Sequence, residues 1–164
     1  MTLNAVENDN IQDLYRELIL DHARAPRHFG RLDDATHTAL GINPLCGDKL
    51  TLYVRVDDEG TIEASAFEGS GCAISIASAS LLTDIVTGVP VDKAEQVFRS
   101  ITGRLTDTGE DNDIDAEPSL QERLDKLRAL DGVRDFPSRV KCATLAWHAL
   151  HSALGNDAKP ATTE

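Results

Sequence analysis

The sequence predicts a single domain in which antiparallel β-strands are combined with several α-helices. Hydrophobic and polar residues alternate over residues 49–56, and this two-residue period is typical of a strand with one buried face. Over residues 72–87 the hydrophobic residues instead recur at helical spacing. The chain has 164 residues, the size of one ordinary domain, and 41% of them are hydrophobic, which is enough for a core.

Three strands are predicted, and two of them form a hairpin. Residues 49–56 are followed by a turn over residues 57–60, in which Gly60 can adopt the positive φ that hairpin loops require. Residues 61–68 then place small and branched hydrophobic residues on one face and form the second strand of the hairpin. Residues 36–43 are predicted as a third strand.

The helices are predicted from hydrophobic spacing and from the prolines that limit them. The expected helices are residues 10–24, residues 72–87, a segment that begins at Asp92 with its carboxylate as cap, a short segment after Pro118, and a last segment after Pro137. Residues 1–9 are expected to be a flexible N-terminus and residues 155–164 a flexible tail, so the domain spans residues 10–154. Six of the eleven residues 107–117 are acidic and none is basic, which predicts a solvated loop.

The charge of the chain excludes two classes of partner. The 28 acidic and 16 basic residues give a formal net charge of −12, whereas nucleic acids and anionic membranes bind clustered Lys and Arg. No apolar run approaches the roughly 20 residues that span a bilayer. The first residues lack the basic and apolar regions of a signal peptide, so we expect a cytoplasmic protein with neither nucleic acid nor membrane as partner.

Three cysteines are the most informative residues of the chain. An odd number in a cytoplasmic protein argues against a disulfide framework and leaves a buried hydrophobic role, a reactive thiol or a metal site. Cys46 lies in the loop that leads into the hairpin, and Cys72 and Cys142 are predicted at helix starts. Unpaired amides and the helix dipole favour thiolate at such positions.

Asp48 adds a fourth potential ligand, since it follows Cys46 across a single glycine. Three thiolates and one carboxylate make up the four ligands of a tetrahedral zinc site. Two alternatives stay open from the residues alone: each cysteine can be a small buried hydrophobe, and Asp48 can be a turn residue. His22 and His28 are interpreted as core or surface histidines rather than ligands, because no other ligand motif lies beside them.

Four stretches carry a resemblance to a known family: residues 14–22, 43–48, 71–80 and 139–147. They include three cysteine motifs in order, Asn43-Pro44-Leu45-Cys46-Gly47-Asp48, Gly71-Cys72-Ala73 and Lys141-Cys142-Ala143. The chain resembles the U-type iron–sulfur assembly proteins over residues 11–154, and within them the SufU branch. The resemblance implies an α+β fold, with a three-stranded antiparallel sheet packed against helices. It also implies that Cys46, Asp48, Cys72 and Cys142 meet at one exposed end as metal ligands.

The resemblance further separates two functions. The resemblance implies that proteins of the IscU branch are scaffolds for a [2Fe–2S] cluster. These proteins typically have a His directly before the third cysteine and a Leu-Pro-Pro-Val-Lys segment just upstream of it. This chain has Lys141 in place of that His, and Asp135-Phe136-Pro137-Ser138-Arg139 in place of the upstream segment. The acidic insertion at about residues 103–120 is similar to the one that marks the SufU branch.

The resemblance therefore implies a zinc-dependent sulfurtransferase. Such a protein is a zinc-bound sulfur acceptor that takes persulfide sulfur from a SufS-type pyridoxal-phosphate cysteine desulfurase. It passes the sulfur to a SufBCD-type scaffold for iron–sulfur cluster assembly. The alternatives are a scaffold that carries a [2Fe–2S] cluster or iron, and a zinc module that only docks to a partner.

Cys46 is the expected catalytic residue. It lies in a loop beside glycine, while the other two cysteines are expected at helix starts, so it is the ligand best able to leave the metal. We expect a His of the desulfurase to replace it on zinc, which frees the thiolate to attack the persulfide. Arg139, three residues before Cys142, is either a support for the negative sulfur or a surface residue.

Overall fold

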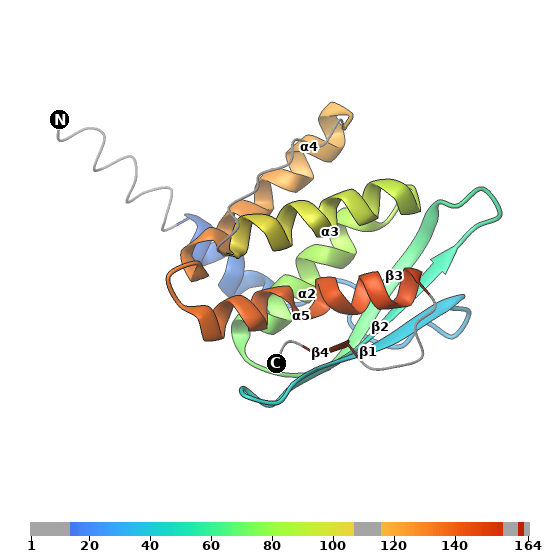
Figure 1. Cartoon of the computed structure of the whole chain (residues 1–164). Helices are drawn as coiled ribbons and strands as arrows, with labels where there is room; N and C mark the ends of the chain where they lie inside the picture. Colours follow the sequence, from blue (N-terminus) through green and yellow to red (C-terminus); the bar gives the residue numbers. More distant parts are fainter. Residues whose placement is uncertain (1–13, 107–115, 156–160, 163–164) are drawn as a thin grey trace.

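The computed structural model describes residues 14–106, 116–155 and 161–162, and its helices all lie over one face of a single sheet (Figure 1). The strands are β1 (His37–Asn43), β2 (Asp48–Val56), β3 (Ile62–Ser70) and β4 (Ala161–Thr162). Residues 14–24 are helical, and the later helices are α2 (Ala73–Val86), α3 (Val91–Leu105), α4 (Pro118–Asp125), the 3-10 helix η1 (Lys126–Val133) and α5 (Pro137–Leu154). The α+β class is confirmed.

The sheet has the order β3-β2-β1-β4, and its first three strands are antiparallel as predicted. Alternation in β2 turns Leu50, Leu52 and Val54 toward the helices, where all three are buried. The short strand β4 pairs in parallel with β1, with Ala161 beside Gly41. The prediction of a flexible tail over residues 155–164 is therefore wrong at residues 161–162, where a free sheet edge supplies backbone partners.

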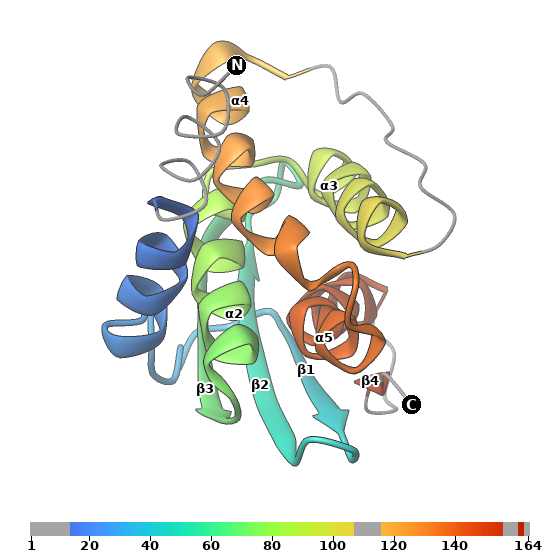
Figure 2. The ribbon, with the colours of Figure 1, turned by 90° about the vertical axis from the view of Figure 1, so that its left-hand side faces the viewer.

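Helices α2 and α5 lie directly on the sheet, with the helical residues 14–24 beside α2 and with α3 outside α5 (Figure 2). Helix α5 packs against β1 and β2, and α2 packs against β3 and α5. The close approach of α5 to β1 depends on Gly41, because a Cβ there would lie 3.2 Å from the Leu145 side chain. Trp147 of α5 is completely buried at the centre of this core.

Two helix predictions differ from the structure at their ends. Helix α3 begins at Val91, with Pro90 as its N-cap residue and no side-chain cap, so the prediction of a cap at Asp92 is wrong. The backbone amide of Val91 instead donates to Gly60 O in the hairpin turn. The helix after Pro118 continues as η1 because residues 126–133 keep hydrophobic side chains against the core.

Most of the predicted acidic loop lies outside the described residues. The ranges that are not described are residues 1–13, 107–115, 156–160 and 163–164.

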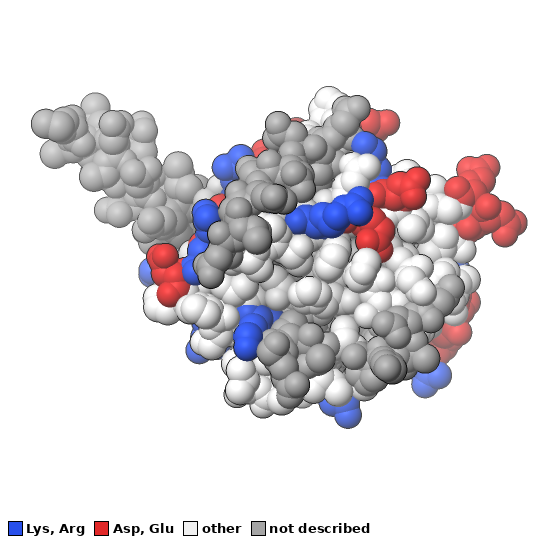
Figure 3. Space-filling view, in the orientation of Figure 1, with Lys and Arg blue, Asp and Glu red and all other residues white. Residues whose placement is uncertain are grey.

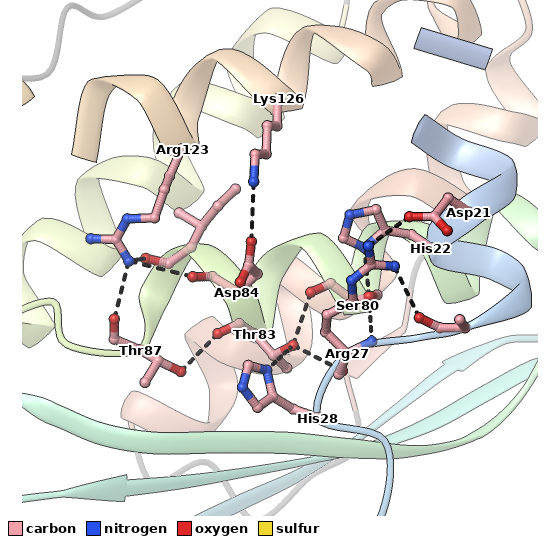
Figure 4. A network of polar contacts seen from close by, with 12 residues as sticks. Asp21, His22, Arg27, His28, Ser80, Thr83, Asp84, Thr87, Arg123 and Lys126 are labelled. Atoms are coloured by element: carbon pink, nitrogen blue, oxygen red, sulfur yellow. Dashed lines mark hydrogen bonds and ion pairs between the residues drawn. The ribbon is translucent and has the colours of Figure 1, made fainter. Parts of the chain in front are cut away.

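A polar network fastens the N-terminal helical segment to α2 (Figure 4). His22 is buried, and its Nδ1 lies 2.6 Å from Ser80 Oγ, which also accepts a hydrogen bond from the Arg27 amide. Thr83 Oγ1 donates to Arg27 O and lies 3.2 Å from His28 Nδ1. His22 is thus a core histidine and His28 an exposed one, as the sequence indicated. Within the described ranges, no helix has the length and apolar character needed to cross a membrane.

Protonation of His22 is predicted to destabilise the fold. Burial lowers the pKa of His22, and the Arg27 cation lowers it further. Because the unfolded chain binds this proton more readily, the stabilisation is fully present above about pH 6.5. It is lost as the pH falls below that value, at no more than about 1.4 kcal/mol per pH unit. Urea unfolding between pH 7.5 and 5.5 measures the loss, and His22→Gln should reduce it. A variant with the full pH dependence of the original protein would contradict the assignment.

Candidate metal centre

The cysteine-bearing segments meet at one end of the sheet (Figures 1 and 2). The turn at residues 44–47 joins β1 to β2 at this end, and the N-termini of α2 and α5 lie beside it. Each segment carries one cysteine: Cys46 in the turn, Cys72 before α2 and Cys142 in α5. All three cysteines are free thiols.

Three of the four predicted ligands come together. Ligand atoms of Cys46, Asp48 and Cys142 all lie within 4.8 Å of one another, and they form the one such cluster of His, Cys, Asp or Glu among the described residues. Asp48 is 1% exposed and Cys142 is completely buried, whereas Cys46 is exposed to solvent. The cluster therefore has two buried donors and one accessible sulfur.

Hairpin geometry explains how Cys46 and Asp48 are brought to one point. Asn43 and Asp48 are register partners at the ends of β1 and β2, so a four-residue turn holds Cys46 between them. Gly47 has a φ of +73°, a left-handed conformation that costs glycine nothing and other residues about 1 kcal/mol or more. Strand alternation then places Asp48 on the same inward face as Leu50.

The Asp48 carboxylate is held by both oxygens. Oδ1 accepts a 2.9 Å hydrogen bond from the backbone amide of Cys72, and Oδ2 accepts one of 3.3 Å from Asn43 Nδ2. These hydrogen bonds cross from β2 to the start of α2 and to β1, so the alternative of a simple turn residue does not describe Asp48. A buried carboxylate with two donors is fixed in direction and retains its acceptor capacity toward a cation.

Cys72 is the N-cap residue of α2, as predicted, and its Sγ accepts a hydrogen bond of 3.5 Å from the Ser75 amide. Its sulfur is outside the set of three mutually close ligand atoms, although it belongs to the same hydrogen-bonded group as Cys142. The amides of the first helical turn favour a negative sulfur here. Cys72 thus borders the cluster from the α2 side.

Cys142 does not begin a helix, contrary to the sequence prediction. Helix α5 begins at Pro137, which places Cys142 in the second turn, where its sulfur contacts Ser138 O at 3.6 Å. Burial raises the pKa of the Cys142 thiol, and hydrogen bonds with Asp48, Cys46 and Cys72 raise it further. A divalent cation bound next to this sulfur would lower its pKa and favour the thiolate.

Arg139 faces the sulfurs. Electrostatic attraction from Cys72 and Cys142 raises the pKa of Arg139, with smaller contributions from a hydrogen bond with Cys72 and from the charge of Cys46. The side chain belongs to the first turn of α5 and is exposed. Support of negative sulfur by Arg139, one of the two sequence-based alternatives, stays a prediction.

Two supporting residues were not singled out from the sequence. Asn43 is completely buried and donates to both Asp48 Oδ2 and Cys142 Sγ. The sequence signal that could have identified Asn43 is its position opposite Asp48, across the four-residue turn of the hairpin. Gly71 lies against the carboxylate, because a Cβ there would stand 2.6 Å from Asp48 Oδ1. The glycine before Cys72 therefore makes room for the carboxylate.

The donor set suits zinc. Thiolate and carboxylate are established zinc ligands, and tetrahedral sites rich in cysteine bind this ion in preference to hard cations such as Mg²⁺. Cys46, Asp48 and Cys142 supply three donors. Cys72 is the candidate for the fourth, since its backbone amide donates to Asp48 Oδ1. An Asn amide that orients two of the donors is the kind of outer contact that metal ligands require.

Gly71→Ala is predicted to weaken zinc binding by about 10–100-fold, which is typical when a ligand loses its orientation. The added methyl group would displace the Asp48 carboxylate, because a Cβ at this position is too close to Oδ1. Competition with a chromophoric chelator measures the affinity. Gly132→Ala is the matched control, since a Cβ there has no atom within 4 Å. Equal affinity of both variants and the original protein would show that Asp48 does not contribute to the site.

Comparison with known proteins connects this site to a family. A family profile described as the NifU-like N-terminal domain matches residues 14–143. The chain is 36% identical over 150 residues to the zinc-dependent sulfurtransferase SufU of Bacillus subtilis, with 92% of this chain and 95% of that protein covered. It is 37% identical over 148 residues to the iron–sulfur cluster assembly scaffold protein IscU of Thermotoga maritima, with 90% and 96% covered.

A solved structure shows a likeness to the same group of proteins. The protein from Fervidobacterium islandicum, described as an iron–sulfur cluster assembly scaffold protein for the SUF system, superposes with a TM-score of 0.69 at 30% identity. The superposition covers 84% of this chain and 94% of that one. The matched segment contains every residue of the cysteine cluster. The chain therefore belongs to the NifU-like N-terminal domain family, which includes proteins named SufU and IscU.

Proposed function

We propose that this protein is a zinc-bound sulfur acceptor, with Cys46, Asp48, Cys72 and Cys142 as ligands. It takes persulfide sulfur from a SufS-type cysteine desulfurase and delivers it to a SufBCD-type scaffold. The observation that carries the proposal is the position of one exposed sulfur, Cys46, within 4.8 Å of two buried donors, Asp48 and Cys142. The likeness to a zinc-dependent sulfurtransferase over 92% of this chain adds support.

Exposure selects Cys46 as the residue that receives sulfur. Cys142 is buried within a helix, and Cys72 is fixed as the N-cap of α2. Cys46 lies exposed in a four-residue turn beside Gly47, so a partner can reach its sulfur. The free thiols that the reaction requires agree with the cytoplasmic location expected from the sequence.

Sulfur transfer is an exchange between sulfur atoms with no net oxidation. The Cys46 thiolate attacks the outer sulfur of the desulfurase persulfide and forms a new S–S bond. The original S–S bond breaks, its electron pair leaves with the desulfurase cysteine as a thiolate, and Cys46 becomes the persulfide. Zinc, when bound, supplies the positive charge that keeps the cysteine sulfurs ionised at neutral pH. Arg139 faces the same sulfurs and favours their negative charge.

The surface around the cluster supports docking of a protein partner. Leu45, next to Cys46, is 69% exposed, and Phe136, at the start of α5, is 59% exposed. In Figure 3 the acidic side chains gather toward the right, beyond the turn between β2 and β3. The opposite end of the sheet, where β1 turns into β2, shows fewer acidic side chains in the same view. We propose that Leu45 and Phe136 contact the desulfurase, since exposed apolar side chains around a reactive group are typical of interfaces.

A scaffold for a [2Fe–2S] cluster or iron is the second candidate. The likeness to the IscU protein of Thermotoga maritima, at 37% identity over nearly the whole chain, favours it, and the same four donors suit such a cluster. Lys141 in place of the His that typically precedes the third cysteine weighs against it. A zinc module that only docks to a partner is the third candidate.

Metal analysis after purification without oxygen tests these candidates. The proposed function predicts a colourless protein with about one zinc per chain, because thiolate-rich tetrahedral sites of this kind hold zinc. A brown protein with iron and sulfide would support the scaffold instead. The addition of purified SufS-type desulfurase then separates sulfur transfer from docking alone, since only the former raises sulfide production by the desulfurase.

Cys46→Ala is predicted to abolish stimulation of the desulfurase, because it removes the attacking sulfur. Mass spectrometry of the original protein after a single desulfurase turnover should find one added sulfur atom on Cys46. Ser138→Ala, an exposed substitution near the same end, is the control and should retain both the stimulation and the added sulfur. Full stimulation by a folded Cys46→Ala variant would refute the role of Cys46.

A further inference from the structure

Asn43 connects two of the clustered donors and leaves out the third. Its Nδ2 donates to Asp48 Oδ2 at 3.3 Å and to Cys142 Sγ at 3.5 Å. Both of these acceptors are buried, whereas Cys46 is exposed to solvent. One side chain thus orients the buried carboxylate and the buried thiol together.

Asn43 leaves one of its own polar atoms without a hydrogen bond. Asn43 is completely buried, and its Oδ1 has no hydrogen-bond partner within the described part of the chain. A buried polar atom without a partner costs about 1–3 kcal/mol, and leucine, which has the same branched shape and no polar atom, would avoid that cost. The residue is therefore explained by the two acceptors that its nitrogen reaches.

The neutral amide is suited to a site that holds a cation. Asp48 and Cys142 are both negatively charged when they bind a metal, and each is strengthened by a donor that fixes its direction. A lysine or arginine at position 43 would supply hydrogen bonds but would also repel the cation. Asn43 supplies two donor hydrogens from one nitrogen and adds no charge.

We propose that Asn43 is a positioning residue that keeps Asp48 and Cys142 as retained metal ligands, so that Cys46 is the ligand that exchanges. The inference rests on the proposed function, because it assumes that the cluster binds zinc and that Cys46 accepts sulfur. It adds a reason why Cys46, rather than another ligand, exchanges: Asp48 and Cys142 are buried and share the Asn43 amide, whereas Cys46 is exposed.

Zinc release and cysteine labelling test this role without any desulfurase. Zinc-loaded original protein and Asn43→Leu are mixed with a chromophoric chelator, and the dissociation rate is followed by absorbance. Loss of the shared donor is expected to increase zinc dissociation by about 10–100-fold. Brief treatment with iodoacetamide, followed by mass spectrometry, should label Cys46 first in the original protein. In Asn43→Leu it should label Cys46 and Cys142 together.

A second variant provides the control for the loss of a buried polar group. Ser65 is also buried and hydrogen-bonded, to Thr83 O and Thr87 Oγ1, in the middle of β3. Ser65→Ala should lower the melting temperature while leaving the zinc dissociation rate and the labelling order unchanged. If Asn43→Leu does not fold, Asn43→Ala replaces it, and the same two changes are expected.

The outcomes separate this inference from the proposed function. If the original protein binds zinc and labels at Cys46 first, but the Asn43 variant releases zinc within twofold of the original rate and keeps the labelling order, the role of Asn43 is overturned. If the original protein binds no zinc, the proposed function itself fails, and the role of Asn43 fails with it.

Discussion

The site depends on a single buried carboxylate. Asp48 is 1% exposed, and burial of an ionised carboxylate costs several kcal/mol unless hydrogen bonds or a cation compensate. The Cys72 amide and the Asn43 side chain each donate to one of its oxygens. These donors come from the start of α2 and from the end of β1. The carboxylate therefore connects the segment that carries Cys72 with the segment that leads into the turn at Cys46. It thereby adds to the pairing of β2 with β3, which already places Lys49 beside Ser70 near the start of α2.

The helices complete the site through their packing. Helix α5 is buried along most of its length, and Gly41 allows it to lie close to β1. This contact carries Cys142 to the end of the sheet where the hairpin turn exposes Cys46. The result is a group of donors with unequal freedom: one sulfur is held in a helix, one caps a helix, and one lies in a turn. That inequality is what a sulfur acceptor requires, since one ligand must react while the others keep the site intact.

Local patterns predicted most of the fold. The period of two in β2 and the helical spacing in α2 are strong signals, and Gly60 marked the hairpin turn. Strand β4 could not be predicted, because its two residues have no period and depend on the free edge of β1. The start of α3 was missed because a tertiary hydrogen bond from Val91 to Gly60 replaces the expected cap.

The ligands were named from the cysteine motifs, and the structure explains what the motifs could not. The burial of Cys142 follows from its place in the second turn of α5, which packs against β1 and β2. The roles of Asn43 and Gly71 arise from contacts across the hairpin and between segments, so they become visible only when the chain is folded. The separation of exposed from buried ligands, on which the proposed chemistry depends, is likewise a property of the packing.

The central claim is that one zinc ion is held by Cys46, Asp48, Cys72 and Cys142 together. X-ray absorption at the zinc edge of the purified protein tests it most directly. The account predicts three sulfur neighbours at about 2.3 Å and one oxygen neighbour at about 2.0–2.2 Å from each zinc ion. Fewer than three sulfur neighbours, or a histidine nitrogen in the first coordination sphere, would contradict it.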